Sequence, residues 1–402
     1  MEDELIGIED KKQTLMGLLM NGKENEMVVS VVGMGGSGKT TLVANTFNNE
    51  NVKRQFDCYA WITVSQTYVI EDLFKQMIKK FHEGRKEEVP EHLNSMSYEN
   101  LLDMLSTYLK SKRYLVVLDD VWDIKLWQEI IMLTTRKKDI AFYSFEVESR
   151  PFEIEPLENN EAWELFSKKA FSSYDNKSCP PELESLAWKL VEKCEGLPLA
   201  VVTLGGLMSS KRSSSEWRRV YNSLNWHLTK HPMLESMSSI LLLSFNNLPN
   251  PLKPCFLYCA LFPEDYLIRR KRLIKLWIAE GLVEPIDGVT PEEVAEDYLV
   301  ELTGRSMLQV ELRNEAGRPK ACKMHDLMRE LALSTSKNEK FGATYVGREI
   351  VDKAEIRRLS IQTTEGEINS CTGMSELRSF LVFGTLKKLP SGFKLLIDFQ
   401  MN

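Results

Sequence analysis

The sequence has little of what marks secreted, zinc-binding or membrane-spanning proteins. Its seven cysteines are scattered without a Cys-x-x-Cys pair, which fits a reducing compartment better than a disulfide or zinc framework. No apolar run reaches the roughly 18 residues that a membrane helix needs. The acidic start, MEDELIGIED, lacks the basic-then-apolar order of a signal peptide. These absences predict a cytoplasmic location.

Positive charge is also in the minority. The chain has 58 acidic and 51 basic residues, a net charge of -7, which argues against a nucleic-acid or anionic-membrane surface spread over the whole chain. At 402 residues the chain is too long for one ordinary core, so we expect several domains.

A glycine-rich loop is the strongest motif that is present. The apolar run MVVSVV predicts a buried strand, GMGGSGKT follows it directly, and TTLVANTFN predicts a helix. The loop fits G-x-x-x-x-G-K-[ST] with Gly33, Gly38, Lys39 and Thr40. In such a loop, backbone N–H groups and the helix N-terminus surround phosphate oxygens. Lys39 would contact the β- and γ-phosphates, and Thr40 would place its hydroxyl on Mg²⁺.

Two acidic residues and an arginine end later apolar runs. In LVVLDD, Asp119 would hold Mg²⁺ and Asp120 would orient an attacking water. Arg136 ends IMLTTR, and its permanently charged guanidinium suits a γ-phosphate sensor. An arginine followed by two lysines is, by sequence alone, more often a solvated strand end.

The order of apolar patterns predicts the fold class. Strands at 27–32, 58–65 and 114–120 alternate with helices, which predicts an α/β P-loop NTPase domain with a parallel sheet covered on both faces. After Pro156 the pattern becomes helical, and Pro198 and Gly196 suit a helix start and a helix C-cap. Helices followed by a strand, a turn and a second strand then predict a winged helix. The expected domains are 1–155 (P-loop), 156–231 (all-α), 232–338 (winged helix) and 339–402 (leucine-rich tail).

The tail contains RRLSIQ, LRSFLVF and LKKLPSGFKLLIDF, about twenty residues apart. This spacing is typical of leucine-rich repeats, but we expect too few repeats here to bury a solenoid core. The chain ends within an apolar run, which predicts a fragment of a longer protein.

Several motifs together resemble the NB-ARC module of plant intracellular immune receptors, the coiled-coil type of nucleotide-binding leucine-rich-repeat disease-resistance proteins. The resemblance covers nearly the whole chain. It rests on GMGGSGKTTL, FDCYAWITVSQ, YLVVLDDVW, LTTR, CEGLPLAVVTLGG, CFLYCALFPED and MHDLMRELA, in the order of the family.

The resemblance implies roles for individual residues. Asp119 would serve Mg²⁺ with Asp120 beside it, and Arg136 would sense the γ-phosphate. Ile6 and Gly7 of LIGIE would lie over the adenine, with Pro198 of GLPL near it, and His325 of MHD would meet the β-phosphate of ADP. The phosphate cradle would consist of Gly33, Gly35, Gly36, Gly38, Lys39, Thr40 and Thr41.

The resemblance also implies a function and partners. ADP would be bound at rest, exchange for ATP would accompany activation, and copies would assemble into a signalling ring. Any hydrolysis would be slow. The coiled coil and most repeats of the family are not in this sequence, so contacts with host or effector proteins would need those domains. The full-length receptor would be cytoplasmic or peripheral at the plasma membrane.

Two other functional classes remain open from the residues. One is a P-loop ATPase with continuous turnover, for which no second catalytic cluster is apparent. The other is a nucleotide-gated DNA-binding regulator using the basic RRKR at 269–272 in the winged helix. The acidic residues nearby argue against nucleic acid.

The segment between Asp120 and Arg136 departs from the expected length. A parallel crossover usually takes a dozen or more residues, but only Val121 to Glu129 precede the apolar run that starts at Ile130. We expect a shortened crossover, a frayed sensor strand or a displaced Arg136. ADP would then still bind, with poor discrimination in favour of ATP and lower domain stability.

Overall fold

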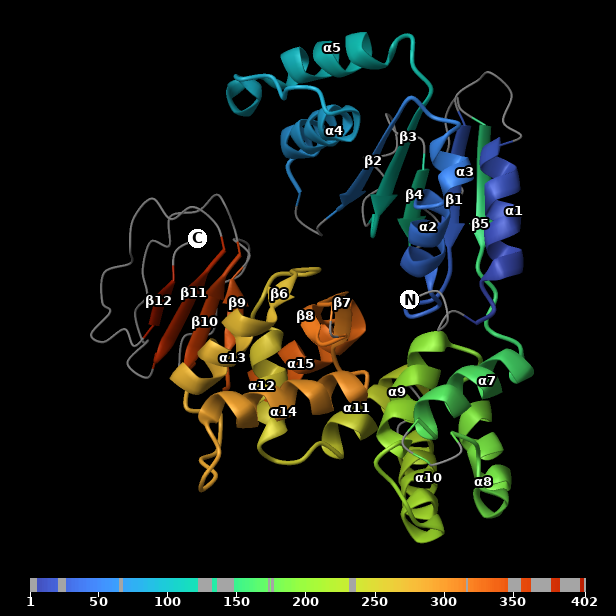
Figure 1. The fold of residues 1–402 in the computed structure, drawn as a ribbon, viewed down its shortest axis with the longest axis vertical. Helices are drawn as coiled ribbons and strands as arrows, with labels where there is room; N and C mark the ends of the chain where they lie inside the picture. Colours follow the sequence, from blue (N-terminus) through green and yellow to red (C-terminus); the bar gives the residue numbers. More distant parts are fainter. Residues whose placement is uncertain are drawn as a thin grey trace. The chain divides into compact units, whose positions relative to one another are not determined.

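The computed structural model describes residues 6–20, 27–64, 68–121, 132–135, 148–172, 174, 177–230, 236–315, 317–345, 356–362, 377–383 and 398–400. The chain forms two compact units (Figure 1). Unit 1 contains residues 1–165 with the short segment Gly196–Leu199, and unit 2 contains 166–195 and 200–402. The four-domain division expected from the sequence stays a prediction.

Unit 1 is built on the predicted parallel sheet, with strand order β2-β3-β4-β1-β5. The strands are β1 (Met27–Val32), β2 (Cys58–Thr63), β3 (Tyr114–Asp119), β4 (Met132–Thr135) and β5 (Glu148–Glu153). Its helices are α1 (Glu9–Met20), α2 (Lys39–Phe47), α3 (Glu50–Lys53), α4 (Ile70–Arg85), the short 3-10 helix η2 (Leu93–Ser95) and α5 (Tyr98–Leu109).

Helices cover both faces of this sheet, as expected for parallel strands. Successive side chains of β3 point to opposite faces. Val116 and Leu118 pack in the cluster that contains α4 and α5, whereas Leu115 and Val117 pack with α1 and α2 (Figure 1). Both clusters are buried, so the sheet forms the centre of the unit.

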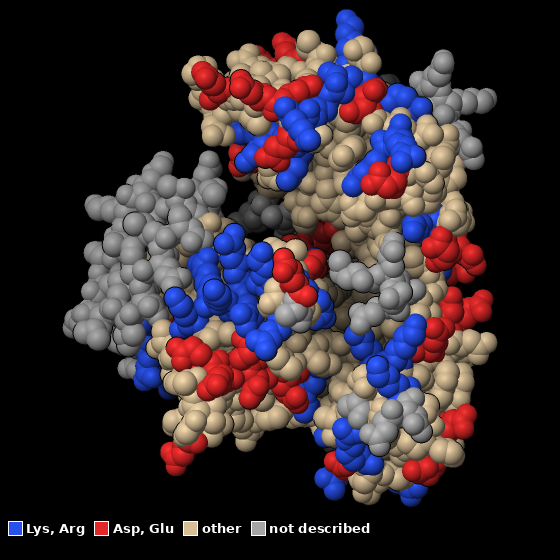
Figure 2. Space-filling model, viewed as in Figure 1, with Lys and Arg blue, Asp and Glu red and all other residues tan. Residues whose placement is uncertain are grey.

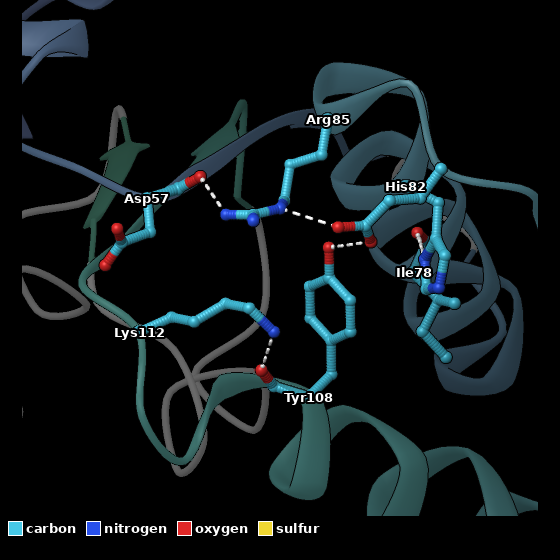
Figure 3. Close-up of polar contacts among 7 residues, drawn as sticks. Asp57, Ile78, His82, Arg85, Tyr108 and Lys112 are labelled. Atoms are coloured by element: carbon cyan, nitrogen blue, oxygen red, sulfur yellow. Dashed lines mark hydrogen bonds and ion pairs between the residues drawn. The ribbon is translucent and has the colours of Figure 1, made fainter.

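A cluster of polar side chains stabilises one edge of the sheet (Figure 3). This is the amino edge, at which β2 and β3 begin. The Tyr108 hydroxyl donates to Glu87 Oε2 at 2.8 Å, and Arg85 Nε donates to Glu87 Oε1 at 2.7 Å. Arg85 also donates to the Asp57 carbonyl, just before β2, at 3.2 Å. Lys112 Nζ lies 3.5 Å from the centre of the Tyr108 ring. Hydrogen bonds from Arg85 and Tyr108 hold the pKa of Glu87 below its ordinary value.

Strand β5 was not expected from the sequence. It contains Pro151 and pairs in parallel with β1 along its length, at the end of the described sheet. Proline is tolerated in edge strands because its missing N–H need not face a neighbour. The same residue hid the strand pattern in the sequence.

The first part of unit 2 is helical. It includes the end of α7 (Asn159–Ala170), α8 (Pro181–Glu192), α9 (Pro198–Met208) and α10 (Ser214–Lys230). The predicted helix start at Pro198 is confirmed. Gly196 was wrongly expected to be the C-cap of α8, because that helix ends at Glu192 and Lys193 caps it. The core of this part contains Trp217, whose ring stacks on Phe171 at 5.5 Å.

A winged helix follows, as the sequence predicts. The three-stranded sheet has the order β6-β8-β7, and Thr290 and Glu293 form a capping box at the start of α14. The elements are α11 (Ser236–Asn246), α12 (Leu252–Cys259), β6 (Ile268–Arg269), α13 (Arg270–Ala279), α14 (Pro291–Gly304), β7 (Gln309–Arg313), β8 (Pro319–Lys323) and α15 (Asp326–Asn338).

The leucine-rich tail contains a small parallel sheet. Its strands form a parallel sheet in the order β12-β11-β10-β9, with β9 (Ala343–Tyr345), β10 (Arg358–Ile361), β11 (Ser379–Val382) and β12 (Asp398–Gln400). Leu359, Phe380 and other side chains of this sheet form a buried cluster. The sheet also contacts the winged helix: Phe383 packs on Phe262 at 5.4 Å, and Gln362 donates to the Leu261 carbonyl. The expectation of too few repeats for a solenoid core stays a prediction.

A buried ion pair also joins the tail to the winged helix. Arg358 Nε donates to Glu280 Oε2 at 2.7 Å, and the guanidinium lies over the Phe341 ring at 4.2 Å.

In the part of the chain that the structure describes, no helix is long and apolar enough to cross a membrane.

Candidate nucleotide-binding site

The glycine loop connects the carboxyl end of β1 to the first turn of α2. Gly36 has φ 75° and Gly38 has φ 90°, both in the left-handed region. A Cβ added at Gly38 would meet nothing within 4 Å, so the backbone conformation explains the glycine there. A Cβ added at Gly33 would lie 2.7 Å from Ser37 Oγ, so close packing explains that one. The sequence needs glycine at these two positions for different reasons.

Lys39, the first residue of α2, turns back into the loop. Its Nζ donates to the carbonyls of Gly33 and Met34, each at 2.9 Å. The side chain is buried, and an ammonium out of water is stabilised by such hydrogen bonds. Backbone carbonyls of the loop therefore fix the position of the Lys39 ammonium.

Ser37 adds a polar group that was not predicted from the sequence. Its hydroxyl is buried in the loop and makes no hydrogen bond with any group in the described part of the chain. A buried polar atom without a partner is costly. Phosphate oxygens bound in the loop are acceptors that suit this donor.

Thr40 and Asp119 meet at the carboxyl edge of the sheet. The Thr40 hydroxyl donates to Asp119 Oδ1 at 3.0 Å, although the two residues are 79 positions apart in the chain. Asp119 ends β3 and is almost fully buried. A hydroxyl oxygen and a carboxylate oxygen at this spacing match the hard oxygen ligands that Mg²⁺ prefers.

Asp120 follows β3 in an unusual conformation. Its φ of 58° lies in the left-handed region, which costs an L-residue about 1 kcal/mol or more and occurs mainly at functional positions. Aspartate tolerates this region better than most residues. The Val64 N–H donates to the Asp119 carbonyl at 2.9 Å, which fixes the backbone from which Asp120 projects.

The segment that contains Pro198 touches the glycine loop. The Leu199 N–H donates to the Gly36 carbonyl at 3.2 Å, and the Leu157 N–H donates to the Gly196 carbonyl at 2.8 Å. A Cβ added at Gly196 would lie 2.4 Å from the Leu157 carbonyl oxygen. Gly196 is thus required for a close approach between backbones.

Gly7 lies against the same segment. It has φ 68°, and an added Cβ would lie 2.5 Å from Leu157 Cδ2 and 2.7 Å from Glu161 Oε1. Leu157, for which no role was predicted, therefore contacts both segments predicted to lie near the adenine. Its place in a short apolar-poor linker after β5 gave no signal of this role.

Strand β4 runs parallel between β1 and β3, as expected. Its described residues are Met132–Thr135, and among them Leu133 pairs with Leu118 of β3. Its last residue, Thr135, is level with Val32 at the edge where the glycine loop begins. Arg136 and the segment 122–131 lie outside the described residues, so the expectations for them stay predictions.

His325 belongs to unit 2, where it is the N-cap of α15. Its Nδ1 accepts from the Leu327 N–H at 3.2 Å. That hydrogen bond requires an unprotonated Nδ1, so the neutral ring carries its proton on Nε2. Met324 is buried, and Asp326 is the first residue of the helix.

Unit 1 thus brings together Gly7, the glycine loop, Asp119, Asp120 and Pro198 along one edge of the sheet. Backbone N–H groups, one ammonium and a hydroxyl–carboxylate pair converge there, a combination suited to a phosphate chain with a divalent cation.

Comparison with known proteins agrees with this geometry. Residues 8–176 match the NB-ARC domain, and residues 261–332 match the disease resistance protein winged helix domain. Disease resistance protein RPM1 of Arabidopsis thaliana is 50% identical over 356 residues, covering 86% of this chain and 38% of the relative. Disease resistance protein RPP13 of the same plant is 34% identical over 418 residues, covering 96% and 47%.

The chain therefore spans less than half the length of these two relatives. The matched domains are those that the site and the three-stranded sheet indicate. The chain belongs to the plant disease-resistance proteins that combine an NB-ARC nucleotide-binding domain with a winged helix.

Proposed function

We propose that the chain is the ADP/ATP-dependent switch of a plant intracellular immune receptor. The observation that carries this proposal is the glycine loop with Lys39 at its mouth and the Thr40–Asp119 contact beside it. Membership of the disease-resistance family supports an immune role.

The glycine loop would bind the phosphates of ADP or ATP. Backbone N–H groups of Gly33 to Thr41 would donate to phosphate oxygens, and Lys39 would exchange its two carbonyl acceptors for phosphate oxygens. Thr40 and Asp119 would hold Mg²⁺, which neutralises phosphate charge when it is bound.

Asp120 and Arg136 would distinguish the two nucleotides. The carboxylate of Asp120 would orient water near the γ-phosphate, and Arg136 would donate to the γ-phosphate itself. The position of Thr135 beside Val32 supports the second role because Arg136 follows it directly. Any hydrolysis would be a slow step of the switch.

The adenine would lie against Ile6, Gly7 and Pro198. The contacts of Leu157 with Gly7 and Gly196 support this arrangement, because they bring both segments to the mouth of the glycine loop.

His325 would donate from Nε2 to the β-phosphate of ADP and hold the resting state. In a receptor with its remaining domains restored, His325→Ala should release ADP faster and signal without a trigger, because a contact present in only one state is lost. Unchanged ADP release would assign His325 to helix capping alone.

The active receptor would form a ring of copies and contact host or effector proteins through other domains, in the cytoplasm or at the plasma membrane.

The decisive experiment measures the nucleotide that copurifies with the unmodified chain, together with its steady-state hydrolysis. We expect about one tightly retained ADP per chain and little turnover. Rapid multiple turnover would instead indicate a conventional ATPase. Neither ADP nor ATP at the site would contradict the proposal.

A further inference from the structure

Two bands of opposite charge lie side by side on the winged-helix part of unit 2 (Figure 2). Lys and Arg side chains gather where Figure 1 shows β6 and the adjoining end of α13, and Asp and Glu side chains form a band next to them, toward α14. The basic band consists of the exposed residues Arg269, Lys271, Lys275, Arg313, Arg318 and Lys320. Because the whole chain has a net charge of -7, this positive charge is a property of one surface region and not of the chain as a whole.

The residues of this basic band have no acidic partners among the described residues, although Arg313 donates to the Gly317 carbonyl at 2.9 Å. Neighbouring cations do have acidic partners: Arg270 pairs with Glu296 at 2.6 Å, and Lys323 pairs with Glu311 at 3.2 Å. For the six residues of the basic band, no acidic group among the described residues lies within ion-pair distance. Their charge therefore remains available to an external partner.

The basic band also exposes apolar surface. In the sheet, Arg269 and Leu312 both pair with Ala321, on either side of β8, and the register of β7 is irregular on both sides of Leu312. Leu312 is 46% exposed, and Leu267, just before β6, is 41% exposed.

The acidic band also combines exposed charged residues with exposed apolar residues, but its charge is negative. It is formed by α14 and the loop before it, with exposed Glu284, Asp287, Glu292, Glu293 and Asp297. Glu293, Asp297 and Val300 are spaced by four and three residues, which places them on one side of the helix. Val300, Ile286 and Val289 are exposed among these acids.

Exposed apolar residues are thus concentrated in the two bands. Of the eight large apolar side chains exposed in the described part of the chain, five lie here: Leu267, Leu312, Ile286, Val289 and Val300. Apolar residues surrounded by charge of one sign are typical of protein interaction sites rather than of an inert surface.

We propose that a second copy of this chain docks on this face across a two-fold axis, so that the basic band of each copy meets the acidic band of the other. Two adjacent bands of opposite sign are self-complementary under such a rotation, which is the commonest symmetry of protein pairs. Leu267 and Leu312 of one copy then face Val300 and Ile286 of the other. The contact needs no nucleotide exchange and does not depend on the proposed switch.

Nucleic acid fits this face less well. Phosphates attracted to the basic band would approach the adjacent acidic band, whose carboxylates repel them. A second copy satisfies both signs of charge and covers the apolar side chains as well.

The first test measures the mass of the whole chain by sedimentation at rising protein concentration, in low and in physiological salt. We expect a concentration-dependent dimer that salt weakens, because exposed charges are screened. A monomer at all concentrations up to about 100 μM, a range in which weak interfaces are populated, would overturn the proposal. So would growth into open oligomers, which a two-fold contact forbids.

Two charge-reversed variants then test the pairing of the bands. Lys271→Glu with Lys275→Glu leaves four cations and two carboxylates in the basic band, and Asp287→Lys with Asp297→Lys leaves three carboxylates and two cations in the acidic band. Each variant alone should dimerise at least about tenfold more weakly, because both contacts between the bands lose most of their charge attraction. In an equimolar mixture a heterodimer should form more tightly than either homodimer, because one of its two contacts joins unmodified bands. Dimerisation of each variant at wild-type strength, or a mixture that stays monomeric, would refute the contact.

The matched control reverses charge elsewhere. Glu88→Lys with Glu91→Lys changes net charge as much as the second variant, at exposed positions of unit 1, and should leave dimerisation unchanged. Equal melting temperatures of all variants would show that they are folded. Salt-sensitive binding of a DNA duplex by a wild-type chain that remains monomeric would assign the basic band to nucleic acid and overturn the proposal.

Discussion

The two edges of the parallel sheet in unit 1 are stabilised in different ways. At the carboxyl edge, Gly36, Gly38 and Asp120 hold left-handed backbone conformations, and Lys39 donates to backbone carbonyls. At the amino edge, side chains bond to side chains, as in the contacts of Glu87 with Arg85 and Tyr108. The first edge presents groups to a ligand, whereas the second joins helices to strands. Substitutions at the two edges should therefore separate binding from stability.

The largest effect is expected at the carboxyl edge from Lys39→Ala. Each charged hydrogen bond to phosphate contributes about 1.5–3 kcal/mol, so ADP affinity should fall about 100-fold or more. Calorimetric titration and the copurified nucleotide measure this loss. Thermal unfolding without nucleotide should change less than ADP affinity, because the two hydrogen bonds described for Lys39 go to backbone carbonyls of its own loop. Retention of ADP at wild-type stoichiometry would remove Lys39 from the site.

The amino edge should respond in the opposite way to Tyr108→Ala. The Tyr108 ring stacks on His82 at 4.7 Å and on Phe81 at 6.1 Å, and its loss should lower the free energy of unfolding by about 2 kcal/mol. ADP affinity should stay within about twofold. Tyr108→Phe, which keeps the ring, is the control and should lose less. A larger change in ADP affinity than in stability would show that the two edges are coupled.

The short connection before β4 offers a way to sharpen the comparison. Inserting about a dozen residues of family-like sequence between Ile130 and Ile131 should let the crossover reach its usual length. We expect a higher melting temperature and a several-fold gain in ATP affinity over ADP, the latter lost again with Arg136→Ala. If neither quantity changes, or if Arg136→Ala already weakens ATP binding in the unmodified chain, the short connection impairs neither stability nor the recognition of ATP.

The smallest effect concerns pH at the amino edge. The pKa of Glu87 is lowered in the folded state, so its contribution to stability is present above its ordinary pKa of 4.5 and is lost as pH falls below that value. The difference in melting temperature between wild type and Glu87→Gln should therefore be largest near pH 7 and shrink toward pH 3. A difference that grows on acidification would reverse the assigned direction.

The carboxyl edge was largely predictable because its signals are contiguous. Gly33 to Thr41 and the pair Asp119 and Asp120 stand next to apolar runs whose period reveals the strands. Gly196 was assigned a local role, whereas the structure explains it by a contact with Leu157, which is distant in sequence. Contacts of that kind leave no periodic pattern.

The amino edge and the tail were not predictable for a related reason. Arg85, Glu87 and Tyr108 are ordinary surface residue types, and only the packing of α4 and α5 brings them together. The tail sheet contacts Phe262 and Leu261 of the winged helix through Phe383 and Gln362. A count of repeats cannot reveal a partner surface supplied by another domain.

Pro151 has a further consequence for how the protein behaves in a crowded solution. The Ile154 N–H donates to the Val32 carbonyl of β1, and alternation along the strand turns the nitrogen of Pro151 away from β1. The outer side of β5 therefore lacks a donor at the middle of its length. An extended segment of another protein that tried to add itself there would leave one carbonyl without a partner. Pro151 thus protects the sheet against misassembly during synthesis, when such edges are most exposed.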